Sequence, residues 1–569
     1  MLIRGRFPTS SRAQGGAAGM SLWDYGQTNL NEEEHYKYDR GFYRRELEQK
    51  LLIYAGCLGA CELQQEAHYQ NRQSGAWSSL DLLELQGFPA FLLNNRYWAI
   101  HAPVGETDIT DYENQIHLEW SVRETREAID MAFRVLADSV VLHPGTYNLK
   151  SRRFWPQPEE ALLITNHRRV ALHTSLKALI DHFLYRLEEW QDRLATFLTT
   201  QRALADDLQG LFREYDAAPL LTMPRYRLAA QILELITREQ LGVDLVRWCK
   251  NPERGVRLAI ENVEPPNFII CTAGQLRRFH SRMTEMYQEA FEQSTRLSPD
   301  VFDRFRPGMV LDVAHLLNSK IMLSTPEHSG IAHIFEDHED LERAFVSLPG
   351  EFPTDRSGLP VEPLLNKFVR EGTRDLLCVY VAGSHRTDRV MTTHDPIRAF
   401  RERMLLHPRV GAQGSVHRYG LLPFDPEIEL NLAEVIQVFG PDRTYMMKLF
   451  DVAQERVLAS FNNLVAYLDF LRAEEQRARE RIAEHLAELR ESAATVADAQ
   501  WAEERLARCR FYLRPFRKSA ELGRLGYDEI GFYSFFDEGP EAVDIFATVK
   551  EESGLVWVAP APASYQKSS

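Results

Sequence analysis

The feature that most constrains this 569-residue chain is a series of short apolar runs, rich in Val, Ile and Leu, that alternate with longer amphipathic segments. Runs of this kind are typical of strands buried on both faces of a parallel sheet. The predicted strands are Leu51–Ala55, Tyr97–His101, Ser139–His143, Val256–Glu261, Met309–Asp312, Leu376–Val381 and Glu427–Leu430. Repeated β–α units in this number, without a glycine-rich dinucleotide fingerprint after any strand, predict an α/β fold of the (β/α)8 TIM-barrel type.

Two helical segments exceed what a minimal barrel needs. Leu176–Leu245 carries apolar residues at three- and four-residue spacing between two predicted strands, which predicts a large helical insertion at about 176–245. A second helical pattern runs over Tyr445–Arg510, and its Arg472–Arg490 part is dense in Glu and Arg with a thin apolar seam. We therefore predict a coiled-coil-like extension over 436–510 that faces solvent or a protein partner, including a second copy of the chain.

The two ends of the chain differ from the segment between them. Residues 1–19 contain three arginines, many small residues and no acid, so we expect a disordered leader. A transit peptide, or a translation start at Met20, are the alternatives. The metal-binding barrel is then predicted over 20–435, and an aromatic segment with a tail over 511–569.

Composition narrows the classes of protein that remain. No apolar run approaches the roughly 18–20 residues that span a bilayer, so an integral membrane protein is excluded. The formal net charge of −16 disfavours a protein that grips phosphate backbones, so nucleic acid is not an expected partner. The six cysteines form no disulfide framework and no zinc-ribbon spacing, which indicates reduced thiols and a cytoplasmic protein.

Residues able to bind a metal ion follow the predicted strands at their C-terminal ends. They are His101, His143, Glu261, Asp312, His315, His385 and Glu429, with His394 on the loop after the sixth strand. These ends converge on one mouth of a barrel, and a mixture of imidazoles and carboxylates suits Zn²⁺, Mn²⁺ or Fe²⁺. Taken singly, each residue has a structural alternative: Glu261 as a buried ion-pair partner, for example, or Asp312 as a helix N-cap. Together they predict one or two divalent transition-metal ions per chain, because buried charge is costly unless it is paired or metal-bound.

The order of these motifs resembles the xylose isomerase-like TIM-barrel superfamily, which contains sugar isomerases, epimerases and the endonuclease IV group. The resemblance covers roughly residues 50–435 and rests on His-Ala-Pro, His-Pro-Gly, Glu-Asn and Leu-Asp-x-x-His, which begin at His101, His143, Glu261 and Leu311. It implies that Glu261 bridges or ligates the metal with Asp312, His315 and Glu429 around it. It also implies that His101 and His143 bind a further metal ion or the substrate.

Departures from the family patterns leave several alternatives open. The endonuclease branch has a histidine where this chain has Tyr380 and an aspartate where it has Thr392, which counts against a trinuclear zinc site. The segments that contain His385, His394 and Asp395 are similar to those of multinuclear non-haem iron enzymes that oxidatively modify peptide cysteines. That branch, however, has Asn-Asn where this chain has Ala-His before Leu316. Tyr380, His385 and Asp395 are therefore additional candidates for the site.

Four functions fit these observations. We favour a metal-dependent isomerase or epimerase of a small polar substrate, sugar-like or carbonyl, in which Glu261 or Glu429 moves a proton. The alternatives are an oxidative non-haem iron enzyme that acts on a peptide and a phosphodiesterase of the endonuclease IV type. The fourth is a degenerate barrel that serves as a scaffold for the helical segments.

Overall fold

The structure is a computed structural model, and it describes fifteen segments of the chain. These are residues 18–23, 60–64, 97–103, 107–144, 158–219, 222–263, 269–294, 296–323, 329–333, 335–347, 352–381, 432–447, 509–515, 527–534 and 555–557, with Leu93, Leu468 and three other single positions between 476 and 484.

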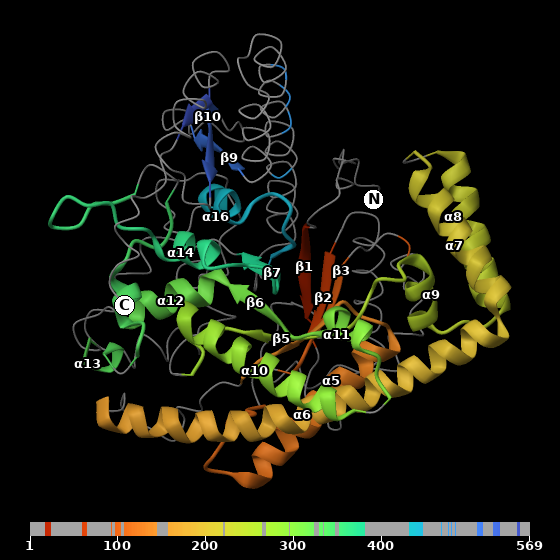
Figure 1. Cartoon of the computed structure of the whole chain (residues 1–569), viewed down its shortest axis with the longest axis horizontal. Helices are drawn as coiled ribbons and strands as arrows, with labels where there is room; N and C mark the ends of the chain where they lie inside the picture. The colour runs from red at the N-terminus through yellow and green to blue at the C-terminus, as the bar shows by residue number, and fades with distance from the viewer. Residues whose placement is uncertain are drawn as a thin grey trace, which may run out of the picture.

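Eight parallel strands form the centre of the described structure (Figure 1). They are β1 (Ala18–Trp23), β2 (Ala60–Gln64), β3 (Tyr97–His101), β4 (Ser139–Leu142), β5 (Arg257–Glu261), β6 (Gly308–Asp312), β7 (Leu376–Val381) and β8 (Tyr445–Met447). Each strand pairs with the next one in the chain, and β8 pairs back with β1, so the sheet closes into a barrel.

Helices follow the strands from β3 to β7. They are α5 (Gln115–Arg134) after β3; α6 (Pro158–Thr200), α7 (Arg202–Ala217), α8 (Met223–Arg238) and α9 (Val243–Lys250) after β4; α10 (Ala273–Gln293) and α11 (Pro299–Phe305) after β5; α12 (Val313–Leu323), α13 (Ser329–Ala332), the 3-10 helix η4 (His338–Glu342) and α14 (Leu364–Arg370) after β6; and α16 (Leu432–Phe439) after β7. The predicted α/β fold with a parallel sheet is confirmed. The segments after β1, β2 and β8 lie almost wholly outside the described residues, so the complete eightfold repeat stays a prediction.

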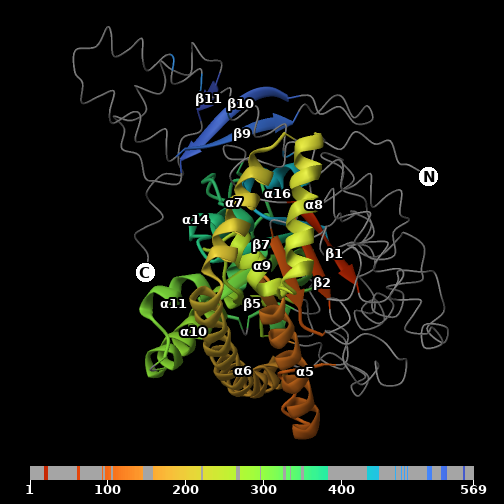
Figure 2. The ribbon, with the colours of Figure 1, turned by 90° about the vertical axis from the view of Figure 1, so that its right-hand side faces the viewer.

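The long helix α6 belongs to the outer layer of the barrel. It contacts both α5 and α10, and it runs across the lower part of the molecule in Figure 1. Its buried side chains recur at three- and four-residue spacing, among them Leu172, Leu176 and Leu179. The smaller helices α7 and α8 contact each other; they stand to the right of the strands in Figure 1 and in front of them in Figure 2. The helical segment predicted at about 176–245 therefore lies within a longer run that begins at Pro158.

Several predicted boundaries are wrong because sheet pairing decides them. Ala18 and Gly19 belong to β1, although the disordered leader was predicted to reach residue 19. Tyr445–Met447 forms β8 and pairs with β1 and β7, although a helical extension was predicted there. Hydrogen bonds from two neighbouring strands outweigh the helical spacing of so short a segment.

The C-terminal segment contains a second sheet. The strand β9 (Cys509–Pro515) is antiparallel to β10 (Tyr527–Ser534), and β11 (Leu555–Trp557) is parallel to β10. The helical prediction that ended at Arg510 is therefore wrong for Cys509 and Arg510. The predicted strands Leu51–Ala55 and Glu427–Leu430 lie outside the described residues, as does nearly all of the predicted coiled coil.

Alternate residues of the strands point into the barrel. One buried cluster contains Ala60, Ala99, Val141, Ala259, Val310, Cys378, Tyr380 and Met446, which come from seven strands. Because side chains on a strand alternate between faces, the residues two positions further along β2, β3, β5 and β6 also point inward. Those residues are Glu62, His101, Glu261 and Asp312, and all four are buried.

Candidate metal centre

Glu261 and Asp312 are the last residues of the neighbouring strands β5 and β6. The side chain of Asn262 joins the two strand ends: its Nδ2 donates to the Asp312 carbonyl at 2.9 Å, and its Oδ1 accepts from the Asp312 N–H at 2.8 Å. The Asn262 amide therefore adds two hydrogen bonds between the ends of β5 and β6, beyond those of the backbone. It fixes the backbone on which both carboxylates stand.

The carboxylate of Asp312 also begins the following helix. Its Oδ1 accepts the backbone N–H of His315 at 2.9 Å, so the structural alternative of a helix N-cap is present. Its Oδ2 lies 3.5 Å from the Nε2 of His315. The two oxygens of Asp312 thus have different neighbours, and capping does not prevent a role at the mouth.

Glu261, Asp312 and His315 form a compact group of potential ligands. One ligand atom from each lies within 4.8 Å of the others. The Nε2 of His315 is 4.0 Å from the Oε1 of Glu261. Two carboxylates and one imidazole on a buried wall are a donor set that suits Zn²⁺, Mn²⁺ or Fe²⁺.

His101 approaches Glu261 from β3. Its Nε2 lies 2.7 Å from the Oε2 of Glu261, and its Nδ1 lies 2.7 Å from the carbonyl oxygen of Ala102. A carbonyl oxygen only accepts, so Nδ1 carries a proton and the ring orientation is fixed. Both side chains are fully buried, so the partner that the ion-pair alternative requires for Glu261 is present; the contact is an ion pair when Nε2 is protonated as well.

His143 lies next to this group. Its ring centroid is 6.0 Å from that of His101, and 9% of the residue is exposed. The structure therefore brings His101, Glu261, Asp312 and His315 together and places His143 beside them. The remaining predicted site residues, His385, His394, Asp395 and Glu429, lie outside the described residues.

Tyr380 makes a different contact from the one expected of a metal ligand. Its hydroxyl donates a hydrogen bond to the Oε2 of Glu62 on β2. Burial raises the pKa of Tyr380 well above its usual value, and the negative charges of Glu62 and Glu261 raise it further. The sequence interpretation missed Glu62, because Glu62 and Gln64 interrupt the apolar run by which the other strands were recognised. The available signal was the two-residue spacing of Ala60 and Glu62, which places both side chains on the same face of a strand.

A buried ion pair supports the loop that follows β3. Arg168 of α6 donates to both carboxylate oxygens of Asp108, at 3.2 and 3.0 Å. Asp108 also accepts the backbone N–H and the hydroxyl of Thr110. This pair connects α6 to the segment that leads from His101 into α5. It was not predicted from the sequence, since the two residues lie far apart in the chain.

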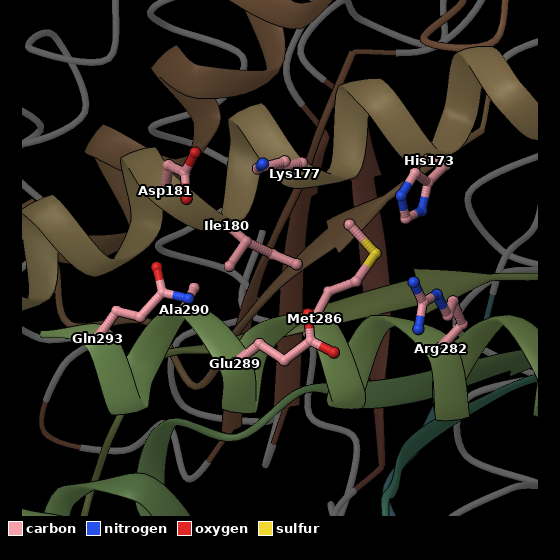
Figure 3. Close-up of a pocket in the computed structure, with 9 residues that line it drawn as sticks. All are labelled: His173, Lys177, Ile180, Asp181, Arg282, Met286, Glu289, Ala290 and Gln293. Carbon is pink, nitrogen blue, oxygen red and sulfur yellow. The ribbon is translucent and has the colours of Figure 1, made fainter.

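The described residues also contain a groove outside the barrel, between α6 and α10. It has a cavity volume of about 160 Å³ and is lined by His173, Lys177, Asp181, Arg282, Met286 and Glu289, among others (Figure 3). None of the candidate ligands lines it. We therefore place the chemistry at the barrel mouth and not in this groove.

No family model and no curated protein matches the chain. Among the described helices, none is long and apolar enough to cross a membrane.

Several solved structures resemble the chain, and they are xylose isomerase-like TIM-barrel proteins. A 3-keto-D-glucoside 4-epimerase from E. coli is 10% identical and matches 80% of this chain and 99% of its own, with a TM-score of 0.33. Endonuclease IV from Thermus thermophilus is 12% identical, with coverages of 80% and 99% and a TM-score of 0.32. D-psicose 3-epimerase from Clostridium cellulolyticum is 9% identical, with coverages of 80% and 98% and a TM-score of 0.31. Likenesses this weak carry no argument about activity, so the chemistry rests on the side chains of the site.

Proposed function

We propose that the chain is a divalent-metal-dependent enzyme that isomerises or epimerises a small sugar-like or carbonyl substrate at the mouth of the barrel. The observation that carries this proposal is the group of Glu261, Asp312 and His315, whose ligand atoms lie within 4.8 Å of one another. Buried carboxylates in such a group are costly unless a cation or a proton neutralises them.

The residues of the site would bind the metal ion, transfer a proton and position the ligands. Glu261, Asp312 and His315 would hold the ion, which when bound supplies a Lewis acid for a carbonyl or hydroxyl oxygen. We also assign to Glu261 the transfer of a proton from the substrate, with its Oε2 held 2.7 Å from the Nε2 of His101. Asn262 keeps the two strand ends in register through its hydrogen bonds to Asp312.

The net charge of −16 favours a small polar substrate over a nucleic acid, so we place the phosphodiesterase second. An oxidative iron enzyme would depend on His385, His394 and Asp395, which lie outside the described residues. Glu429 also lies outside the described residues, and it stays a candidate for a second proton-transferring group.

The test is metal analysis of protein purified without chelator, followed by assays with D-fructose, D-tagatose and D-psicose in the presence of Mn²⁺, Co²⁺ or Zn²⁺. We expect at least one transition-metal ion per chain and conversion of at least one of these ketoses to its epimer or to its aldose isomer. Removal of the ion with EDTA should abolish turnover, and its return should restore it. A folded protein that binds none of the three metals would refute the proposal.

A further inference from the structure

We propose that Tyr380 is a second proton-transferring residue of this site and that Glu62 is the carboxylate that accepts its proton. The inference rests on the proposed function and gives Tyr380 and Glu62 a role in the site other than metal binding. It starts from the hydrogen bond between the Tyr380 hydroxyl and the Glu62 carboxylate.

Tyr380 stands at the same level of the barrel as the metal group. In the pairing of β6 with β7, Asp312 and Tyr380 are direct register partners. Partners in a parallel pair point to the same face of the sheet, so both side chains are directed inward. Each residue is 1% exposed, so the barrel buries Tyr380 as fully as the proposed ligand Asp312.

The phenol side chain crosses the barrel interior. It begins on β7 and reaches Glu62 on β2, past β8 and β1. The interior of an eight-stranded barrel is only wide enough for its own side chains, so this ring occupies the half of the mouth opposite β5.

The direction of the hydrogen bond determines what the pair can do. The Tyr380 hydroxyl donates to Glu62, and a phenol oxygen has lone pairs that accept from a further donor. A substrate hydroxyl can therefore give its proton to the Tyr380 oxygen while the proton of Tyr380 passes to Glu62. The substrate O–H bond breaks with its electron pair left on oxygen, the old Tyr380 O–H bond breaks, and new O–H bonds form on Tyr380 and Glu62. The reverse transfer returns the proton at the end of the reaction.

Such a relay would complement the carboxylate of Glu261 on β5. Isomerisation of a hydroxy-carbonyl compound moves one proton between carbons and another between oxygens. Glu261 is placed for the first transfer, and the pair of Tyr380 and Glu62 is placed for the second. The competing explanation is that the hydrogen bond only ties β7 to β2.

The experiment compares Tyr380→Phe, Glu62→Gln and the double variant with the wild type, on a ketose that the wild type isomerises to an aldose, because epimerisation moves no proton between substrate oxygens. Each single variant should lower kcat by about 10²- to 10⁴-fold, with the double variant no slower than the slower single one, because the two residues act as a unit. The bound Co²⁺ per chain and its visible absorption should stay unchanged. The solvent deuterium isotope effect on kcat of the wild type should exceed unity and should fall in both single variants.

Tyr445→Phe and Glu124→Gln are the matched controls. Tyr445 is a fully buried tyrosine of β8 whose hydroxyl donates to the Gly440 carbonyl at 2.7 Å, and Glu124 is a buried glutamate of α5. Both controls should keep kcat within about threefold of the wild type.

Three outcomes would overturn the inference. The first is a Tyr380→Phe variant with wild-type kcat, and the second is a variant that loses its Co²⁺, which would make Tyr380 a ligand or a structural group. The third is additive losses in the double variant. If Tyr380→Phe fails to fold, Glu62→Gln answers the same question, since it leaves the phenol in place. A wild type that binds metal but converts no ketose ends the proposed function and this inference together. An active wild type with active variants, or a wild type that only epimerises ketoses, ends this inference alone.

Discussion

The imidazole of His101 and the carboxylate of Glu261 meet at 2.7 Å, although 160 positions separate them in the chain. Both side chains are fully buried, and the second ring nitrogen of His101 is held by the Ala102 carbonyl. The contact therefore requires a proton between the two groups or a cation shared by them. This relationship makes Glu261 the residue whose replacement best separates a metal ligand from an ion-pair partner.

We expect Glu261→Gln to remove metal binding while leaving the fold intact. The amide keeps the size of the carboxylate and loses the charge that a divalent ion requires. Co²⁺ titration should show at least a 100-fold weaker affinity, with thermal unfolding of the metal-free protein close to that of the wild type. Glu124→Gln, in α5, is the buried control and should bind Co²⁺ normally. A metal-free Glu261→Gln protein that melts far below the metal-free wild type would instead identify Glu261 as a structural ion-pair partner.

Asn262→Ala should weaken metal binding without removing any proposed ligand. It deletes the hydrogen bonds to the N–H and carbonyl of Asp312, and each buried group left unpaired costs about 1–3 kcal/mol. Loss of such a supporting contact typically weakens metal affinity by about 10- to 100-fold. Unfolding in urea and Co²⁺ titration would measure the two effects.

Asn366→Ala is the matched control for that variant. Asn366 bridges the backbone of Ser347 in the same manner, with its Oδ1 accepting at 3.3 Å and its Nδ2 donating at 2.9 Å. It should lose a similar amount of stability and keep wild-type affinity for Co²⁺. Equal loss of affinity in both variants would mean that general destabilisation, and not the position of Asp312, explains the result for Asn262.

The stability that Asp130 contributes should depend on pH. Burial by itself would raise the pKa of Asp130, but hydrogen bonds from His182 and Arg186 of α6 outweigh it and lower the pKa. A carboxyl group whose pKa is lower in the folded state stabilises the protein above its unfolded pKa, and this stability is lost as pH falls through the folded pKa.

Asp130→Asn should therefore cost about 1 kcal/mol at neutral pH. The difference from the wild type should shrink below about pH 4, the range in which an unperturbed aspartate titrates. Urea unfolding from pH 3 to 7 tests this, with the exposed Asp192→Asn of α6 as the control. A difference that stays constant across this range would contradict the assignment.

Two glycine-to-alanine substitutions should change the free energy of unfolding in opposite directions. A Cβ at Gly274 would lie 2.5 Å from the Oδ2 of Asp337, which accepts from the Thr272 hydroxyl and the Gly274 N–H at the start of α10. Gly274→Ala should therefore lower stability by about 1–2 kcal/mol, because it displaces that cap. Gly210 lies within α7 with nothing within 4 Å of the added atom, so Gly210→Ala should raise stability by up to about 1 kcal/mol. Thermal unfolding of both variants would measure the difference, and a destabilised Gly210→Ala would contradict this account.

The sequence by itself determined the strands that are apolar on both faces and the ionisable residues that end them. Tyr97–His101 and Leu376–Val381 were predicted with the bounds that the structure has, because short continuous apolar runs need burial on two sides. The same rule located His101, Glu261 and Asp312, since parallel strands end at one rim whatever their distance in the chain.

Only the tertiary structure decided which of those residues touch, and which weakly patterned segments become strands. The pairing of Glu62 with Tyr380 joins residues 318 positions apart, and no local pattern records it. The three residues of β8 are a strand because β1 and β7 offer them hydrogen bonds, which an isolated segment of that length does not have. Local spacing reports which face of a segment avoids water, whereas contacts inside the barrel depend on how the eight strands are staggered when the sheet closes.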